Sequence, residues 1–152
     1  MPDLTVRENL LLGSPGAGIG WLRGDRLEDA QKVLGRIGGA DITMGARVAD
    51  LTLSQRQQVE ISKAIMKNPR LLILDEATSA LSASVVESVF DLVREQRDSG
   101  TSVLFISHRF HVVEALADRI SVFRNGRRVE TFIKGDHNYG EIIDMMGGQN
   151  IE

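Results

Sequence analysis

The sequence contains no cysteine, which excludes disulfide bonds, thiolate metal sites and a cysteine nucleophile. It also lacks any apolar run approaching the roughly 20 residues needed to span a bilayer. The N-terminal stretch MPDLTVRENL has neither the positive start nor the apolar centre of a secretory signal. We therefore expect a cytosolic protein that meets a membrane only through partner subunits.

An excess of positive charge is missing as well. The chain carries 18 basic and 21 acidic residues, for a net charge of −3, and no basic run contains interleaved aromatic residues. This balance disfavours nucleic acid as a partner. The 152 residues, 42% hydrophobic and 26% charged, are ordinary for a globular protein and suffice for a buried core.

The N-terminal part of the chain has the pattern of helices. A short helix is predicted over residues 4–12, and a second begins near a capping Asp25 and stops at Gly38-Gly39. A third amphipathic helix follows in LTLSQRQQVEISKAIMKNP, residues 51–69, and ends at its Asn-Pro pair.

From residue 70 the pattern changes to that of an α/β fold. RLLILD (70–75) and TSVLFIS (101–107) are short, continuous apolar runs, as expected for strands covered on both faces. Between them, residues 85–97 repeat apolar side chains at helical spacing. A strand, a helix and a strand of these lengths predict a right-handed parallel crossover.

The C-terminal part is predicted to form a helix over 110–117, a hairpin and a short closing helix over 139–146. Asn125-Gly126 between alternating runs is typical of a two-residue hairpin turn. The predicted fold class is α/β, with a mostly parallel sheet and a C-terminal hairpin. We expect a helical subdomain at 1–68 and an α/β core at 69–152.

Two adjacent carboxylates, Asp75 and Glu76, follow the first predicted strand. Ligands of open α/β sheets bind at the carboxyl ends of strands. There an aspartate can hold Mg²⁺ and a glutamate can polarise water that attacks a γ-phosphate. The alternative is that both are solvated residues that end a strand.

His108 follows the second predicted strand, at the same end of the sheet as the two acids. Its imidazole can donate a hydrogen bond to a phosphate oxygen. His111 and His137 are interpreted as structural.

The glycine-rich segment GSPGAGIG is not a phosphate-binding loop. Gly13 and Gly18 have the interval of the first two glycines in G-x-x-x-x-G-K-[ST], but Ile19 and Gly20 stand where Lys and Ser or Thr are required. We interpret this segment as a loop between helices.

Three motifs, LTLSQRQQVEISKAIMKNPRLLILDEATSALS, GTSVLFISHR and LADRISVFRNGR, resemble the nucleotide-binding domain of an ATP-binding-cassette (ABC) transporter. The resemblance runs from about Leu4 to Gly148 and is greatest to the first cassette of ribose, galactose and xylose importers. It implies a P-loop NTPase fold, ATP and Mg²⁺ as ligands, and ATP hydrolysis that drives sugar import.

The resemblance also implies roles for single residues. Asp75 would be the Walker B acid near Mg²⁺, Glu76 the catalytic base and His108 the switch histidine. Ser79 would belong to the D-loop, SALS, which communicates across a cassette dimer.

The segment LTLSQ occupies the position of the family's signature, usually LSGGQ. This implies that Thr52, Ser54 and Gln55 contact nucleotide held by the opposite cassette. A helix N-terminus favours such an anion through its free N–H groups and dipole. Both glycines are replaced, by Leu53 and Ser54, and we expect these side chains to crowd and weaken that contact.

The family implies two partners: a second cassette, which completes a dimer, and a membrane-spanning permease that contacts the segment 1–68. The protein would then lie at the inner face of the cell membrane. The Walker A loop, the adenine-stacking aromatic and the Q-loop glutamine of the family lie upstream of the point matching Leu4. We therefore expect the back portion of a cassette, with little ATPase activity alone.

In the family, the strand that leads to Walker A separates the strands matching 101–107 and 119–124. We expect these two strands either to pair directly or to leave the 101–107 edge for a homodimer contact. A different reading is a non-catalytic interaction module that docks a membrane subunit or a partner cassette. A soluble cassette that works without a membrane subunit is a third.

Overall fold

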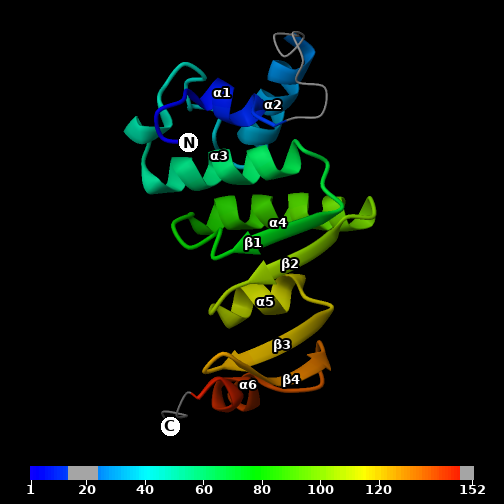
Figure 1. Ribbon diagram of the computed structural model, residues 1–152. Coiled ribbons are helices and arrows are strands. Elements are labelled where there is room, and N and C mark those ends of the chain that lie inside the picture. The colour runs from blue at the N-terminus through cyan, green and yellow to red at the C-terminus, as the bar shows by residue number, and fades with distance from the viewer. Residues whose placement is uncertain (14–23, 148–152) are drawn as a thin grey trace. The chain divides into compact units, whose positions relative to one another are not determined.

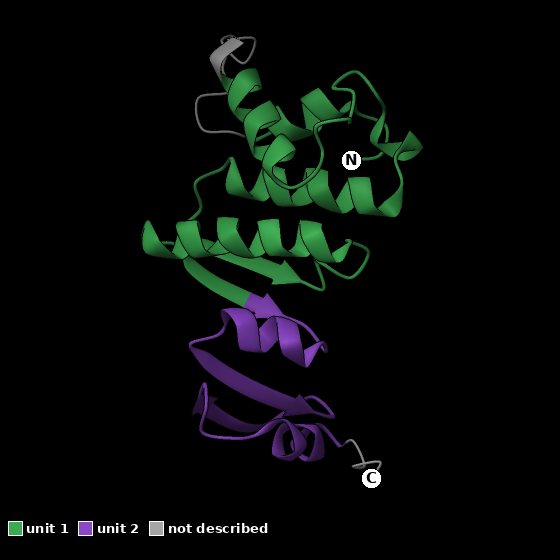
Figure 2. Ribbon diagram, turned by 180° about the vertical axis from the view of Figure 1, so that it is seen from behind, with its two compact units in different colours: residues 1–104 green, residues 105–152 purple. Residues whose placement is uncertain are grey.

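The computed structural model describes residues 1–13 and 24–147 of the chain (Figure 1). Most of the glycine-rich segment GSPGAGIG lies outside the described residues. The chain divides into two compact units, Met1–Leu104 and Phe105–Glu152 (Figure 2). Within the described ranges, no helix combines the length and apolar character required to cross a membrane. The predicted division at residue 68 stays a prediction.

In the described residues, three α-helices and one short 3₁₀ helix form the N-terminal part of the first unit. They are α1 (Val6–Leu11), α2 (Gly24–Arg36), η1 (Val48–Asp50) and α3 (Leu53–Ile65). The three predicted helices are confirmed, although α2 begins one residue before its predicted cap. The chain leaves α2 through Gly38, whose φ of +79° suits glycine and ends the helix as predicted.

These helices enclose an apolar core. The side chains that form it come from all four elements and the loop between α2 and η1, and each is less than a tenth exposed: Val6, Leu10, Ala30, Leu34, Ile42, Val48, Leu51 and Val59. A helix as short as α1 has little stability of its own, so burial of its apolar face is what holds it.

Next along the chain come β1 (Leu71–Asp75), α4 (Ala83–Asp98) and β2 (Ser102–Ile106), and the boundary between the two units falls within β2, after Leu104. The two strands pair in a parallel, two-stranded sheet connected through α4, as predicted (Figure 1). β1 buries only one face, because Leu72 and Leu74 are 2% and 4% exposed whereas Leu71 and Ile73 are 54% and 55% exposed. The expectation that both faces are covered is therefore wrong for β1, because the face that carries Leu71 and Ile73 is exposed.

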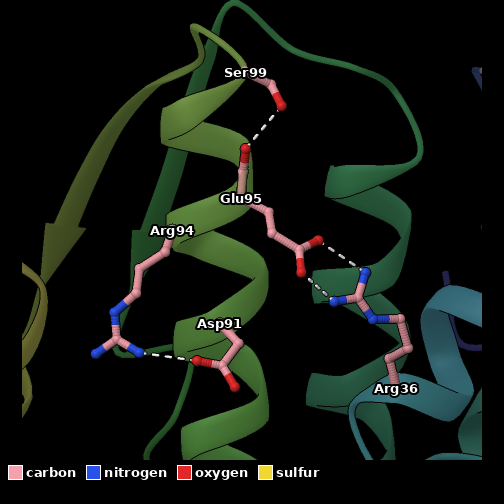
Figure 3. A network of polar contacts seen from close by, with 5 residues as sticks. All are labelled: Arg36, Asp91, Arg94, Glu95 and Ser99. Atoms are coloured by element: carbon pink, nitrogen blue, oxygen red, sulfur yellow. Dashed lines mark hydrogen bonds and ion pairs between the residues drawn. The ribbon is translucent and has the colours of Figure 1, made fainter.

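An ion pair connects the end of α2 to α4. The Arg36 guanidinium donates two hydrogen bonds, of 2.5 and 2.9 Å, to the Glu95 carboxylate (Figure 3). On α4 itself Arg94 donates to Asp91 at 2.9 Å, and the Ser99 hydroxyl donates to the Glu95 carbonyl at 2.8 Å. The bond from Arg36 lowers the pKa of Glu95. Both partners are about half exposed, so the pair adds geometric definition more than stability.

The second unit contains α5 (Phe110–Leu116), β3 (Arg119–Arg124), β4 (Arg127–Ile133) and α6 (Tyr139–Met146). β3 and β4 form the predicted hairpin. Asn125 and Gly126 have φ values of 51° and 73°, the positive pair that a type I′ turn requires. The core of this unit gathers Ile120, Val122, Phe132 and Ile142.

β2 and β3 belong to separate two-stranded sheets, because β2 pairs with β1 and β3 pairs with β4. The expected direct pairing of 101–107 with 119–124 is therefore wrong. Pairing follows the two short connections instead, through α4 and through the Asn125-Gly126 turn. A homodimer through the 101–107 edge remains a proposal.

His137 lies between two carboxylates at the start of α6. Its Nε2 is 3.2 Å from Glu130 Oε1 on β4, and its Nδ1 is 3.4 Å from Glu141 Oε2 on α6. The ring also meets Phe132 edge to face, at 4.6 Å between centroids. The hydrogen bond to Glu130, followed by the contact with Glu141, raises the pKa of His137 above 6.5.

This arrangement predicts a pH-dependent stability of the second unit. Protonated His137 gains both carboxylates only in the folded state, so its contribution is complete below pH 6.5 and is lost as pH rises through the raised folded-state pKa. Thermal unfolding followed between pH 5.5 and about 8.5 should show this decline, and His137→Gln should remove it. His111→Gln, at an exposed histidine, should leave the profile unchanged. An unchanged profile in the His137 variant would contradict the prediction.

Candidate functional site

The predicted acidic pair lies at the carboxyl end of β1. Asp75 is the last residue of the strand and is exposed to solvent, and Glu76 is the first residue of the following loop and is half-buried. Glu76 has a φ of +48°, in the left-handed region that non-glycine residues rarely occupy. Two neighbouring carboxylates therefore lie at the carboxyl end of β1, the end of a strand at which α/β proteins bind ligands.

The loop after Glu76 is held by local hydrogen bonds and by two buried side chains. The Ser79 amide donates to the Glu76 carbonyl at 3.1 Å, and the Leu81 amide donates to the Thr78 carbonyl at 3.2 Å. Thr78 and Leu81 are 1% and 8% exposed. Ser79 itself is exposed, so the predicted D-loop presents its hydroxyl on a fixed turn.

The predicted signature residues form the start of α3. Thr52 is the N-cap, and its hydroxyl accepts a hydrogen bond from the Gln55 amide at 3.3 Å. The Gln55 side chain accepts from the Thr52 amide at 3.0 Å, which completes a capping box. The pairing engages the Thr52 hydroxyl and the side-chain oxygen of Gln55.

Replacement of the two signature glycines leaves the backbone unstrained. Leu53 and Ser54 lie within α3, and neither belongs to the described non-glycine residues with positive φ. The Leu53 side chain is 64% exposed, so it projects from the helix start into solvent. The predicted crowding therefore concerns an approaching ligand or cassette and not the fold of this loop.

Arg56 supports the loop that leads into α3. Its guanidinium donates to the Leu51 carbonyl at 3.0 Å and to the Ala49 carbonyl at 2.7 Å. Both carbonyls precede α3, so Arg56, which lies in the first turn of the helix, fixes the approach of the chain to Thr52.

Gln57 is a site residue that the sequence reasoning missed. From α3 it reaches the loop after β1: its Nε2 donates to Ser79 Oγ at 3.0 Å, and its Oε1 accepts from the Ala80 amide at 3.1 Å. Nε2 also lies 3.5 Å from the Glu76 carbonyl. The structure thus brings Glu76, Ser79 and the signature helix together through this one amide.

His108 belongs to the second unit, where it follows β2 and is exposed. It lines an open cavity of about 610 Å³ together with His111, His137 and the rings of Phe110 and Tyr139, whose centroids are 4.9 Å apart. The sequence placed His108 beside Asp75 and Glu76, and that proximity stays a prediction.

Within residues 1–13 and 24–147, no group of three or more His, Asp and Glu side chains gathers in a way that could hold a metal ion. Mg²⁺ in nucleotide sites is usually held by one or two carboxylates, waters and the phosphates themselves. An exposed Asp75 at a strand end fits that limited role. The described residues do not form a Mg²⁺ site made of protein ligands alone.

The fold is that of ATP-binding cassettes, which are P-loop NTPases. A solved nucleotide-free ATP-binding cassette from an ABC transporter matches 95% of this chain and 59% of its own, with a TM-score of 0.67 and 25% identity. The dimeric bacterial ABC transporter cassette MJ0796 matches 90% of this chain and 60% of its own, with a TM-score of 0.76 and 23% identity.

The ABC transporter family model matches residues 1–79, and the chain belongs to this family. It is 43% identical over 150 residues to ribose import ATP-binding protein RbsA 1 of Rhizobium johnstonii, and 40% identical over 149 residues to RbsA 2 of Escherichia coli O157:H7. These matches cover 98% and 97% of this chain and 29% of each relative. The chain thus spans less than a third of the curated relatives it matches.

Proposed function

We propose that this chain forms part of the ATP-hydrolysing subunit of an ABC importer for ribose or a similar sugar. Two ribose import ATP-binding proteins at 40% and 43% identity support the class of cargo. The observation that carries the ATPase role is the acidic pair at the end of β1, connected through Gln57 to the helix that begins at the signature. The acidic pair and the predicted signature therefore lie in one unit, and hydrogen bonds of Gln57 connect the loop after β1 to α3.

In this proposal Glu76 is the catalytic base. Its carboxylate orients the attacking water and accepts its proton. Asp75, which is exposed at the end of β1, would hold Mg²⁺. When bound, Mg²⁺ neutralises negative charge on the phosphate groups of ATP during hydrolysis.

The remaining predicted residues serve recognition of the γ-phosphate and of the dimer partner. The start of α3, with Thr52, Ser54 and Gln55, faces the nucleotide of a second cassette, and Ser79 lies on the loop between the two. His108 donates a hydrogen bond to the γ-phosphate. The helical segment 1–68 docks the permease, which keeps the protein at the inner face of the membrane.

A comparison of three samples tests this function: the chain alone, the chain with the permease, and the assembled importer with both cassettes. The sequence has no G-x-x-x-x-G-K-[ST] segment to cradle phosphates, so the chain alone should show little ATP turnover. The assembled importer should hydrolyse ATP and take up ribose. Permease binding that is indifferent to ATP, with no turnover in the assembly, would instead support a non-catalytic docking module.

A further inference from the structure

We propose that Gln57 is a positioning residue that holds the Glu76–Ala80 loop in its hydrolytic geometry, an inference that rests on the ATPase function proposed above. Gln57 lies two residues beyond Gln55, in the second turn of α3. It contacts three successive parts of the loop: the Glu76 carbonyl, the Ser79 hydroxyl and the Ala80 amide.

The hydrogen-bond chemistry fixes the orientation of the Gln57 amide. The Ala80 backbone N–H can only donate, so it must meet the carbonyl oxygen, Oε1, at 3.1 Å. The NH₂ group then points to Ser79 Oγ at 3.0 Å and to the Glu76 carbonyl at 3.5 Å, both of which can accept. A single planar group therefore satisfies donors and acceptors of the loop in one arrangement only.

The loop has a specific need for such support at Glu76. A glutamate at a φ of +48° stores conformational strain, and strained residues persist only where the surroundings determine their geometry. Leu81 and Thr78 are buried and fix the far side of the turn. On the near side, Gln57 contacts the backbone at Glu76 and at Ala80.

Through its position on α3, Gln57 connects the predicted signature to the Glu76–Ala80 loop. α3 begins at the predicted signature, and Thr52 and Gln55 are engaged in their own capping box. A displacement of α3 would therefore move the Gln57 amide and, through its hydrogen bonds, the backbone at Glu76 and Ala80 and the Ser79 hydroxyl. Since a misplacement of about 1 Å can cost on the order of a hundredfold in rate, even a small loosening should affect turnover.

Three variants test the proposal by two independent measurements. Gln57→Leu keeps the volume and removes every hydrogen bond. Gln57→Glu keeps an acceptor for the Ala80 amide and removes the donor. Gln31→Leu makes the same chemical change on the exposed surface of α2 and serves as the matched control.

The first measurement is hydrogen exchange of the Ala80 amide in the chain. Exchange should accelerate by at least about tenfold in Gln57→Leu, return to within a few-fold of wild type in Gln57→Glu, and remain unchanged in Gln31→Leu. Faster exchange throughout α3 and β1 would overturn the proposal, because it would indicate a general loss of stability. Unchanged exchange at Ala80 would also overturn it, because the contact with Gln57 would then not protect this amide.

The second measurement is ATP turnover by the assembled importer. Gln57→Leu should lower kcat by about tenfold or more and leave the KM for ATP within about twofold, because the residue acts on the base and not on nucleotide binding. Gln57→Glu should recover part of kcat. An unchanged kcat would overturn the positioning role. A wild-type assembly without turnover would overturn the proposed function itself, while amide exchange would still report whether Gln57 holds the loop.

Discussion

Glu76→Gln should reduce ATP hydrolysis by the assembled importer by about a hundredfold or more. The amide keeps the size and the hydrogen-bonding reach of the side chain but cannot take a proton from water. General-base catalysis raises enzyme rates by about 10²–10⁴-fold. Replacement of one carboxylate oxygen by an NH₂ group should therefore have a large effect on the rate. Steady-state phosphate release at saturating ATP is the measurement.

The matched control for this variant is Glu87→Gln, at an exposed position of α4. It removes one carboxylate of the same kind and should leave turnover within about twofold of wild type. ATP binding and assembly with the permease should persist in both variants, since neither carboxylate is assigned to those contacts. Turnover above a tenth of the wild-type rate in Glu76→Gln would remove Glu76 from the role of base.

Leu34→Ala should lower the free energy of unfolding of the first unit by about 2–5 kcal/mol. Leu34 is fully buried among the apolar side chains of α1, α2 and α3. Its neighbours cannot close the space left by the missing carbons without moving, so a cavity term adds to the lost burial. Urea unfolding monitored by circular dichroism gives the free-energy change.

Leu53→Ala makes the same substitution in the same unit at a side chain that is 64% exposed. Alanine is at least as favourable as leucine in a helix, so the change should stay within about 0.5 kcal/mol. Equal effects from the two variants would mean that the helical core of the first unit contributes no more to stability than its surface does.

Much of the fold could be predicted because short-range signals decide it. Two apolar runs separated by a helical period gave β1, α4 and β2, and Asn125-Gly126 placed the hairpin turn. The sequence could not predict the register shift in the hairpin between Val122 and Phe123. Register is specified where one face of a strand is buried, and the first four residues of β4 are exposed, so burial does not fix the pairing there.

The burial of β1 shows a second limit. The run LLIL has no polar residue to mark an outward face, so periodicity predicted a strand covered on both sides. In the structure alternate residues are buried and exposed, because helices pack against one side of β1. An apolar composition indicates that a strand can be buried on both faces, but it does not indicate which elements pack against each face.

The candidate site was predictable only where its residues are close in sequence. Asp75 and Glu76 are adjacent, and Thr52 and Gln55 have the spacing of a capping box. Gln57 contacts residues 19 to 23 positions away, so its role follows from how α3 packs beside the loop. A glutamine on a helix carries no local mark that distinguishes such a contact from a solvated side chain.

The left-handed backbone at Glu76 sets two selective pressures against each other. Glycine or asparagine would occupy a φ of +48° more comfortably, yet neither carries a carboxylate. In relatives from hot environments, substitutions that raise thermal stability are therefore expected at almost any other position before position 76. A chain that no longer hydrolyses ATP does not need this carboxylate and can place glycine or asparagine in the turn. Loss of the acid at position 76 would therefore indicate loss of catalysis.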